Sequence, residues 1–459
     1  MKNFLEKISK KILLFLVQVH IKRYKPFIIG ITGSVGKTST REAIKAVLGS
    51  QKNVRAAAGS LNNELGFALT VLGNWDKEYF EQGSSVRLWL KVFLTGLSGL
   101  LFRINKPETY ILEYGADRPG DIKKLAKAVK PNIAVITSIG ELPVHIEFFS
   151  GPEAVAREKS KLIEALEPTG YAILNIDDDV VLDMKKRTKA TVITYGFGEG
   201  AEVRISNFNH KTDNNIPLGT SFKLHYGLNS FVPVNVMGSL GPSQAYAAAA
   251  AAAVGIAMDM NPVRSRARDK VASPEDRGAA TSYGMNLVEI SDALSYYDGP
   301  KGRLKILAGI KNSWLIDDTY NASPASTRLA LSVLRELPAK RHIIVLGDML
   351  ELGKYSIQAH QAIGDLVDGF VDVLVCVGAR AKFIADSAAN QMPKENIYTF
   401  ETAELAKKKV QELLKEGDLV LIKGSQGMRM ERIVEEIMAE PEKKKELLVR
   451  QSKKWLSKQ

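Results

Sequence analysis

Residues 30–38, which read Gly-Ile-Thr-Gly-Ser-Val-Gly-Lys-Thr, constrain the fold of this chain more than any other stretch. An apolar run at residues 27–31 leads into them, and residues 41–48 follow with the apolar spacing of a helix. A strand, a glycine-rich turn, Gly-Lys-Thr and a helix predict a phosphate-binding loop of the short Gly-x-x-Gly-Lys-Thr form. A chance glycine turn after a core strand is the competing interpretation.

This loop predicts a nucleoside triphosphate as ligand. Glycines let backbone N–H groups approach phosphates closely, and the N-terminus of the helix adds a favourable dipole. Lys37 is placed to reach the β- and γ-phosphates, and the Thr38 hydroxyl is placed to bind Mg²⁺. The residues expected to bind the nucleotide here are Gly33, Ser34, Val35, Gly36, Lys37, Thr38 and Ser39.

Composition favours an ordinary globular protein of two or three domains, because 459 residues are enough for several cores. A single cysteine, Cys376, excludes an internal disulfide framework and a cysteine-rich zinc site. We therefore expect a cytoplasmic location. The net charge of +12 is concentrated at residues 2–25 and 443–458, and the chain has no nucleic-acid-binding motif. Solvated faces and anionic small molecules are the preferred explanation, and we expect a monomer.

Two apolar segments are too short to span a bilayer. Residues 1–25 alternate lysines with apolar side chains and predict an amphipathic helix, and residues 88–102 form the second segment. An amphipathic helix can contact a membrane surface, here through residues 1–22, or it can pack against its own protein. We hypothesise that the two segments pack together beside the nucleotide-binding domain.

The fold expected is α/β, with two doubly wound domains, because β-rich apolar runs alternate with helical patterns. The first is a mainly parallel ATPase domain over residues 26–300, with strands at 109–112, 133–139, 172–176 and 192–195 and helices at 121–129 and 152–166. The second is a smaller Rossmann-like domain over residues 301–459, with strands at 314–316, 342–346, 373–377, 397–400 and 419–422. Between two helical patterns, residues 261–285 are polar and predict a disordered insertion.

Polar residues after the strands of the first domain are candidates for the site, since ligands bind at the carboxyl ends of parallel strands. Glu113 is placed to bind Mg²⁺ or to cap the helix at residue 121. His145 follows the next strand, where a histidine is usually an ordinary surface residue. Lys159 is one of several lysines on a helix, and Asn175 suits either adenine and ribose or a turn.

The order of these segments resembles the ATP-dependent Mur ligases, and among them most closely the members that add D-alanyl-D-alanine. The resemblance covers residues 26–437 and rests on the loop, Leu-Asn-Asn-Glu-Leu-Gly at 61–66, Glu-Tyr-Gly-Ala at 113–116, Arg-Glu-Lys at 157–159 and Asn-Ile-Asp-Asp at 175–178. It implies an ATP-dependent, ADP-forming ligase of peptidoglycan precursor synthesis. The carboxylate of a muramoyl peptide would be phosphorylated, and D-alanyl-D-alanine or a related amine would attack the acyl phosphate.

The resemblance also implies roles for residues of the first domain. Glu113 and His145 match metal ligands of the family, and Asn63 matches an asparagine near the γ-phosphate. Lys159 matches a lysine that the family carries as a carbamate, which helps to hold a second Mg²⁺. That modification requires a neutral amine, which burial or neighbouring cations can supply.

In the second domain the resemblance assigns Arg303 to phosphate and Asp318 to ribose. Asn321 and the 348–360 region, with Asp348 and Glu351, would hold the incoming amine, although both carboxylates also suit a helix N-terminus. The residues expected to bind substrate carboxylates are Lys423, Ser425 and Arg429.

Two departures from the family keep alternatives open. Ser243 and Ala247 stand where the family has histidine and asparagine, and residues 1–25 cannot replace the domain that binds the UDP-sugar in these ligases. A ligase acting on a carrier- or lipid-linked peptide is one alternative. A folylpolyglutamate-synthase-like ligase is another, although that family's loop reads Gly-Lys-Gly-Ser. A non-catalytic nucleotide-binding scaffold is the third.

Overall fold

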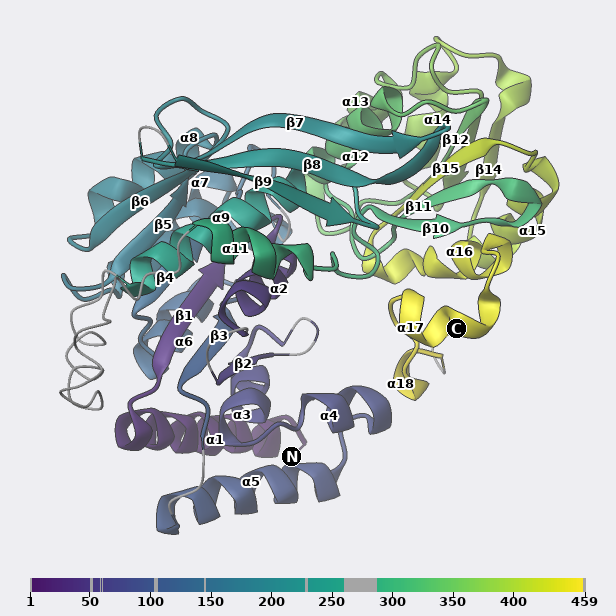
Figure 1. Ribbon diagram of the computed structural model, residues 1–459. Coiled ribbons are helices and arrows are strands. Elements are labelled where there is room, and N and C mark those ends of the chain that lie inside the picture. The colour runs from purple at the N-terminus through teal and green to yellow at the C-terminus, as the bar shows by residue number, and fades with distance from the viewer. Residues whose placement is uncertain are drawn as a thin grey trace.

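A computed structural model describes residues 2–49, 53–57, 59, 61–102, 106–143, 146–227, 230–259 and 287–456. Two features of the sequence, His145 and the segment 261–285, lie outside these residues. The described chain forms two sheets, each covered by helices (Figure 1). The expected fold class, an α/β protein with a larger and a smaller doubly wound domain, is confirmed.

The larger sheet has nine strands in the order β2-β3-β1-β4-β5-β6-β7-β8-β9. Neighbours from β2 to β7 pair in parallel, and β7, β8 and β9 pair antiparallel. The strands are β1 (Phe27–Thr32), β2 (Val54–Ala56), β3 (Thr109–Glu113), β4 (Ile133–Ile136), β5 (Tyr171–Asn175), β6 (Thr191–Gly196), β7 (Val203–Asp213), β8 (Ile216–Tyr226) and β9 (Ser230–Met237).

Helices cover both faces of this sheet, which explains why β1, β3, β4 and β5 read as unbroken apolar runs. Residues 27, 29 and 31 of β1 face one core, and Ile28 faces the other. On the first face lie α2 (Lys37–Gly49), α9 (Pro242–Asp259) and α11 (Leu287–Ser295). On the second lie α1 (Lys2–Tyr24), α3 (Glu64–Leu72), α5 (Val86–Leu101), α6 (Asp121–Ala128), α7 (Pro152–Glu164) and α8 (Asp179–Asp183).

The long strands β7, β8 and β9 reach from this sheet toward the second domain (Figure 1). Ser239, just after β9, forms a bridge with Lys305, and His210 Nδ1 of β7 lies 3.1 Å from Glu336 Oε2. These strands were not expected from the sequence. Through these contacts the strands of the first domain pack against the second domain.

The smaller sheet has six strands in the order β10-β11-β15-β12-β13-β14, all parallel except the β10–β11 pair. The strands are β10 (Lys305–Ala308), β11 (Trp314–Asp318), β12 (Arg341–Gly347), β13 (Val373–Val377), β14 (Ile397–Phe400) and β15 (Asp418–Lys423). Its helices are α12 (Pro324–Glu336), α13 (Ser356–Gly364), α14 (Lys382–Ala388), α15 (Ala403–Leu413) and α16 (Glu431–Ile437), followed by α17 (Lys444–Leu447) and α18 (Lys453–Leu456).

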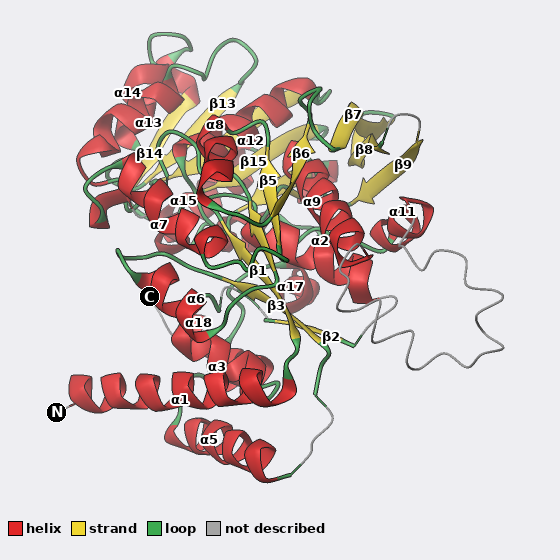
Figure 2. Cartoon of the chain, turned by 90° about the vertical axis from the view of Figure 1, so that its left-hand side faces the viewer, coloured by secondary structure: helices red, strands yellow, loops and turns green. Residues whose placement is uncertain are grey.

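The two apolar segments noted in the sequence become α1 and α5, which lie side by side at one end of the molecule (Figures 1 and 2). His20 Nε2 lies 2.7 Å from the Gly96 carbonyl oxygen, and the Tyr24 hydroxyl donates to the Gly99 carbonyl at 2.5 Å. The hypothesis that the two segments pack together is confirmed. Within the described residues, no helix is long and apolar enough to cross a membrane.

Candidate active site

A cleft of about 580 Å³ lies between the two domains. The loop after β1, the end of β3 and residues that follow β11 and β15 line it, as expected for carboxyl ends of parallel strands. The sequence-predicted residues that line it are Ser34, Val35, Gly36, Lys37, Thr38, Ser39, Glu113, Arg303, Asp318, Asn321, Glu351, Lys423, Ser425 and Arg429.

The glycine-rich loop has the conformation that its sequence requires. Gly33 and Gly36 have φ of +148° and +92°, and a Cβ on Gly33 would lie 1.9 Å from Thr137 Oγ1. The hydroxyl of Ser34 is buried and has no hydrogen-bond partner among the described residues. The first N–H groups of α2 have no acceptor within the helix. A cradle with an unused donor and a helix N-terminus fits a phosphate group.

Two lysines meet behind this loop. Lys37 Nζ donates to the Gly33 carbonyl at 2.7 Å, and Lys159 Nζ donates to the same oxygen at 2.9 Å. Lys159 is 2% exposed, so desolvation, together with the nearby charge of Lys37, holds the pKa of its amine well below the usual range. Desolvation also lowers the pKa of Lys37. The neutral amine that a carbamate requires is therefore favoured at Lys159.

Glu113 is buried at the end of β3 and is paired with a residue that the sequence analysis missed. Its Oε1 accepts a hydrogen bond from Arg41 Nη1 at 2.7 Å, and Arg41, on α2, also contacts Glu42 and the Gly59 carbonyl. Arg41 looks like any other helix cation in the sequence, so no local signal could have singled it out. The pair holds a carboxylate in a fixed place at the cleft.

The donor set suits Mg²⁺, which prefers oxygen ligands. Thr38, Glu113 and Asp117 all line the cleft and offer a hydroxyl and two carboxylates. Within the described part of the chain, no three His, Cys, Asp or Glu side chains are close enough together to bind a metal by themselves. Phosphate oxygens and waters would therefore have to complete the coordination, which is usual for a magnesium–nucleotide complex.

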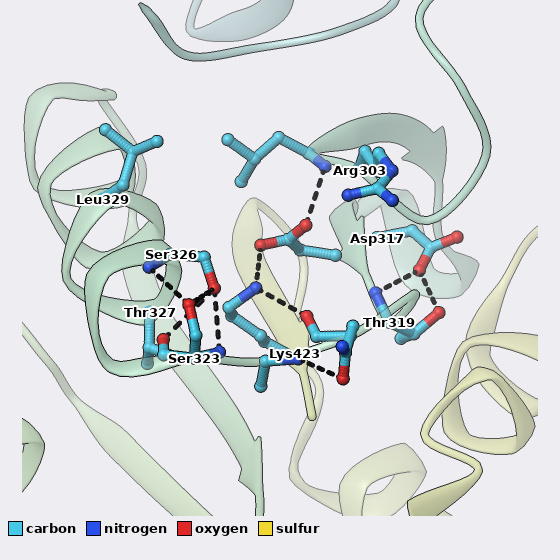
Figure 3. Close-up of polar contacts among 12 residues, drawn as sticks. Arg303, Asp317, Thr319, Ser323, Ser326, Thr327, Leu329 and Lys423 are labelled. Carbon is cyan, nitrogen blue, oxygen red and sulfur yellow. Dashed lines mark hydrogen bonds and ion pairs between the residues drawn. The ribbon is translucent and has the colours of Figure 1, made fainter. Parts of the chain in front are cut away.

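Asp318 and Lys423 form the polar centre of the second domain's side of the cleft. Figure 3 shows Lys423 at the centre of these contacts. Lys423 Nζ lies 2.6 Å from Asp318 Oδ2 and donates to the Asn321 carbonyl at 3.0 Å, and Asp318 Oδ1 accepts from the Leu304 N–H. Strands β11 and β15 are neighbours in register, which places Asp318 beside Lys423. Lys423 is 1% exposed, so this pair is rigidly held.

Arg303 connects the two sides of the cleft. Its guanidinium stacks on Tyr320 at 4.1 Å from the ring centroid, and Nη2 donates to Thr38 Oγ1 at 3.3 Å. Its Nε is buried and has no hydrogen-bond partner within the described residues. The arginine therefore retains an unused donor beside the phosphate-binding loop.

Five of the predicted residues within the described chain do not line the cleft: Gly33, Asn63, Lys159, Asn175 and Asp348. Asn63 caps α3 by accepting from Gly66 N–H, and Asn175 accepts from Asp177 N–H. Asp348 accepts from the N–H groups of Arg380 and Ala381 at 3.0 and 2.7 Å. The side chains of Asn63, Asn175 and Asp348 thus accept hydrogen bonds from nearby backbone N–H groups in this structure.

Several cleft residues were missed as ligand-binding candidates in the sequence, among them Asn62, Asp117, Tyr320 and Trp455. Asn62 lies in the Leu-Asn-Asn-Glu-Leu-Gly segment, Asp117 follows the Glu-Tyr-Gly-Ala segment, and Tyr320 lies two residues after β11, so position alone could have indicated them. Trp455 carried no signal, because its surroundings read as a basic tail. Its carbonyl accepts from Arg429 Nη1 at 2.9 Å.

A glycine-rich loop at a helix N-terminus, placed in a cleft between two α/β domains, is typical of nucleotide-binding α/β enzymes. Two family models match the chain: the Mur ligase middle domain over residues 94–255, and the Mur ligase, glutamate ligase domain over residues 302–426. This protein belongs to the Mur ligase family, whose members are ATP-dependent acid–amino-acid ligases that form ADP. The resemblance seen in the sequence is confirmed.

Comparison with individual relatives leads to the same family. The UDP-N-acetylmuramoyl-tripeptide–D-alanyl-D-alanine ligase of Bacillus subtilis is 28% identical over 429 residues, covering 93% of this chain and 79% of the relative. The enzyme of the same name from Mycobacterium leprae is 30% identical over 420 residues, covering 87% and 71%. The crystal structure of MurF ligase from Thermotoga maritima in complex with ADP has a TM-score of 0.69 at 23% identity, covering 95% and 84%.

Proposed function

We propose that this protein joins D-alanyl-D-alanine, or a closely related amine, to the terminal carboxylate of a muramoyl peptide in peptidoglycan precursor synthesis. The observation that carries the proposal is that one cleft is lined both by the phosphate-binding loop of the first domain and by Lys423 and Arg429 of the second. The names of the two curated relatives supply the substrate class. Such precursors fit a cytoplasmic location, and we expect a monomer without a nucleic-acid partner.

In the proposed reaction the peptide carboxylate attacks the γ-phosphorus of ATP, and ADP leaves. The resulting acyl phosphate is attacked at its carbonyl carbon by the amine, and inorganic phosphate is released. Lys37 and the N-terminus of α2 bind the phosphates, and Arg303 adds positive charge from the second domain. Closure of the two domains around the reactants excludes water, which would otherwise hydrolyse the acyl phosphate.

Thr38 and Glu113 would hold Mg²⁺, which neutralises charge on the phosphates when it is bound. We assign a carbamate on Lys159, with His145, to a second Mg²⁺, and the depressed pKa of Lys159 supports this assignment. We assign Asn63 to the γ-phosphate and Asn175 to the nucleoside. This assignment requires that nucleotide binding moves both side chains into the cleft.

On the second domain we assign Asp318 to ribose and Asn321 with Glu351 to the amine, because all three line the cleft. Lys423, Ser425 and Arg429 would bind substrate carboxylates. Lys423 and Arg429 already neutralise the buried carboxylates of Asp318 and Glu431, so they are positioned without substrate. Asp348 would act indirectly, through the backbone that it caps.

The test is phosphate release from ATP with UDP-N-acetylmuramoyl-tripeptide and D-alanyl-D-alanine, omitting each in turn. We expect release only when both are present, and loss of release in Lys37→Ala. Lys45→Ala is the matched control, since Lys45 is an exposed lysine on the same helix. Release without either substrate, or none with both, contradicts the proposed substrates, and carrier-linked peptides and folates would then be screened as acceptors.

A further inference from the structure

The outward face of α5 is apolar along its whole length. Val86, Leu90, Leu94, Leu97 and Leu101 are 88%, 56%, 52%, 41% and 70% exposed, and their spacing places them on one side of the helix. The opposite side, with residues 88, 92, 96 and 99, is buried against the protein. Helix α5 is therefore apolar on two opposite faces. Packing against the rest of the protein accounts for the inner face only.

The exposed apolar residues cluster at this end of the molecule. Of the 17 large apolar side chains exposed in the described chain, eight belong to α1, α5 and the residue after α5. The other nine are spread over both domains. Single exposed apolar residues are common on soluble proteins, but a contiguous set marks an interaction surface. We call this surface, formed by Ile12, Phe15, Val86, Leu90, Leu94, Leu97, Leu101 and Phe102, the α1–α5 face.

Positive charge surrounds the α1–α5 face. Lys11 and Lys22 are exposed on α1 at positions that share one side with Phe15, and Arg87 is exposed at the start of α5. None of these three cations has an acidic partner among the described residues. In the sequence, residues 2–25 contain seven Lys or Arg and one acidic residue, and residues 83–107 contain no acidic residue. The surface thus combines exposed leucines with uncompensated cations.

The position of this face allows contact with a flat partner. α1 and α5 run side by side at one end of the molecule, and α5 is the outermost element there in both views (Figures 1 and 2). Neither helix is long and apolar enough to cross a bilayer. Helices with an apolar face and a cationic edge lie in the interface of anionic membranes, with the apolar side chains among the acyl chains.

A second copy of this chain fits the same face less well. In a two-fold symmetric dimer the same patch meets itself, so Lys11, Lys22 and Arg87 would approach the same three cations of the partner. Like charges brought together at an interface oppose association. An anionic bilayer supplies both the apolar phase and the opposite charge.

We propose that the α1–α5 face binds the surface of an anionic lipid bilayer and holds the ligase there as a peripheral membrane protein. The apolar stripe of α5 enters the headgroup boundary, and Lys11, Lys22 and Arg87 contact lipid phosphates. The inference is independent of the substrates proposed above, since the face lies outside the cleft.

The experiment is co-sedimentation of the full chain with vesicles of phosphatidylcholine, with and without phosphatidylglycerol. We expect binding to the anionic vesicles only, weakened by salt. The double variant Leu90→Glu/Leu94→Glu should lower the partition coefficient by roughly ten-fold or more. Leu405→Glu is the matched control, because Leu405 is 60% exposed on α15 of the other domain.

Charge is tested separately with Lys11→Glu/Lys22→Glu, against Lys185→Glu/Lys189→Glu on the exposed surface of the first domain. Only the first pair should weaken binding. Unfolding midpoints and ATP binding of all variants should match the parent, which separates lost binding from misfolding. Failure of the parent protein to bind anionic vesicles overturns the proposal. So does a dimer that dissociates in Leu90→Glu/Leu94→Glu, because the face would then serve a second copy.

Discussion

At the scale of single residues, Lys159 is the most informative side chain of the cleft region. It shares the Gly33 carbonyl with Lys37 and lies behind the phosphate-binding loop without lining the cleft. An ammonium in that place would face a second ammonium in a desolvated environment. A carbamate would replace that repulsion with attraction, which gives the modification a physical reason.

Lys159→Ala should therefore lower the rate of phosphate release by about 100-fold or more while ADP binding is largely retained, because Lys37 and the loop are unchanged. Turnover by single-cycle phosphate release and ADP affinity by calorimetry check this. Lys161→Ala is the control, since Lys161 is on the same helix and pairs with Glu164 on the surface. Short carboxylic acids should partly restore the Lys159→Ala rate. Full activity of that variant would exclude the carbamate.

Asp317, next to the site, should control how stability depends on pH. Its carboxyl is fully buried, Oδ1 accepts from Thr319, and Oδ2 has no partner among the described residues (Figure 3). Burial raises its pKa from 3.8 to about 6. Between these values the folded state binds more protons than the unfolded state, so stability falls as pH rises through this window.

Asp317→Asn cannot ionise and should lose this dependence. The stability of the variant relative to the parent should increase by about 2 kcal/mol between pH 4 and pH 7. Urea unfolding across that range measures it, with Asp386→Asn, on the exposed surface of α14, as the control. An unchanged difference across the range would show that Asp317 is ionised at low cost in the folded state.

At the scale of elements, the close packing of α1 on α5 depends on two small residues. Gly96 and Gly99 face α1, and a Cβ on Gly99 would lie 2.5 Å from His20 Cε1. In an isolated helix, Gly→Ala would stabilise by about 1 kcal/mol. Here the methyl group would overlap the buried imidazole of His20, which packs between the two helices.

Gly99→Ala should consequently destabilise the protein by about 1–3 kcal/mol. Thermal and urea unfolding measure the change, and Gly369→Ala is the control, because a Cβ at that position meets no atom within 4 Å. A stabilised Gly99→Ala protein would mean that α5 is not packed on α1 in solution, and the α1–α5 face would then lose its support.

At the scale of the whole molecule, the C-terminal segment connects the two domains. Arg450 pairs with buried Glu431 at 3.1 Å and donates to the carbonyls of Thr319 and Tyr320, and α18 contacts α4 (Asp76–Gln82) of the first domain. Trp455 of this segment lines the cleft. A movement of the C-terminal segment would therefore change the shape of the cleft.

Arg450→Ala should cost about 1–2 kcal/mol of stability, because it removes hydrogen bonds to Glu431 and to the carbonyls of Thr319 and Tyr320, while Arg429 still pairs with Glu431. Residues after 448 should also become more sensitive to proteolysis, and the KM for ATP should rise. Lys443→Ala, which breaks only a surface pair with Glu440, is the control. Unaltered proteolysis in Arg450→Ala would show that other contacts hold the segment in place.

Elements that depend on neighbouring residues alone could be read from the sequence. The strands β3–β6 and β11–β15 were predicted to within about three residues, because most of them are buried on both faces and form continuous apolar runs. The phosphate-binding loop was readable because all of its residues are contiguous. The strands β2, β7–β9 and β10 were missed, since partly exposed strands carry a weaker pattern.

Only the tertiary structure decided which distant residues meet. The pairing of Arg41 with Glu113, the shared Gly33 carbonyl of Lys37 and Lys159, and the approach of Trp455 to the cleft join segments far apart in the chain. It also decided that α5 packs one apolar face inward and leaves the other exposed. Side-chain spacing defines the faces of a helix, but which face is covered depends on the neighbours that strand order and domain packing bring beside it.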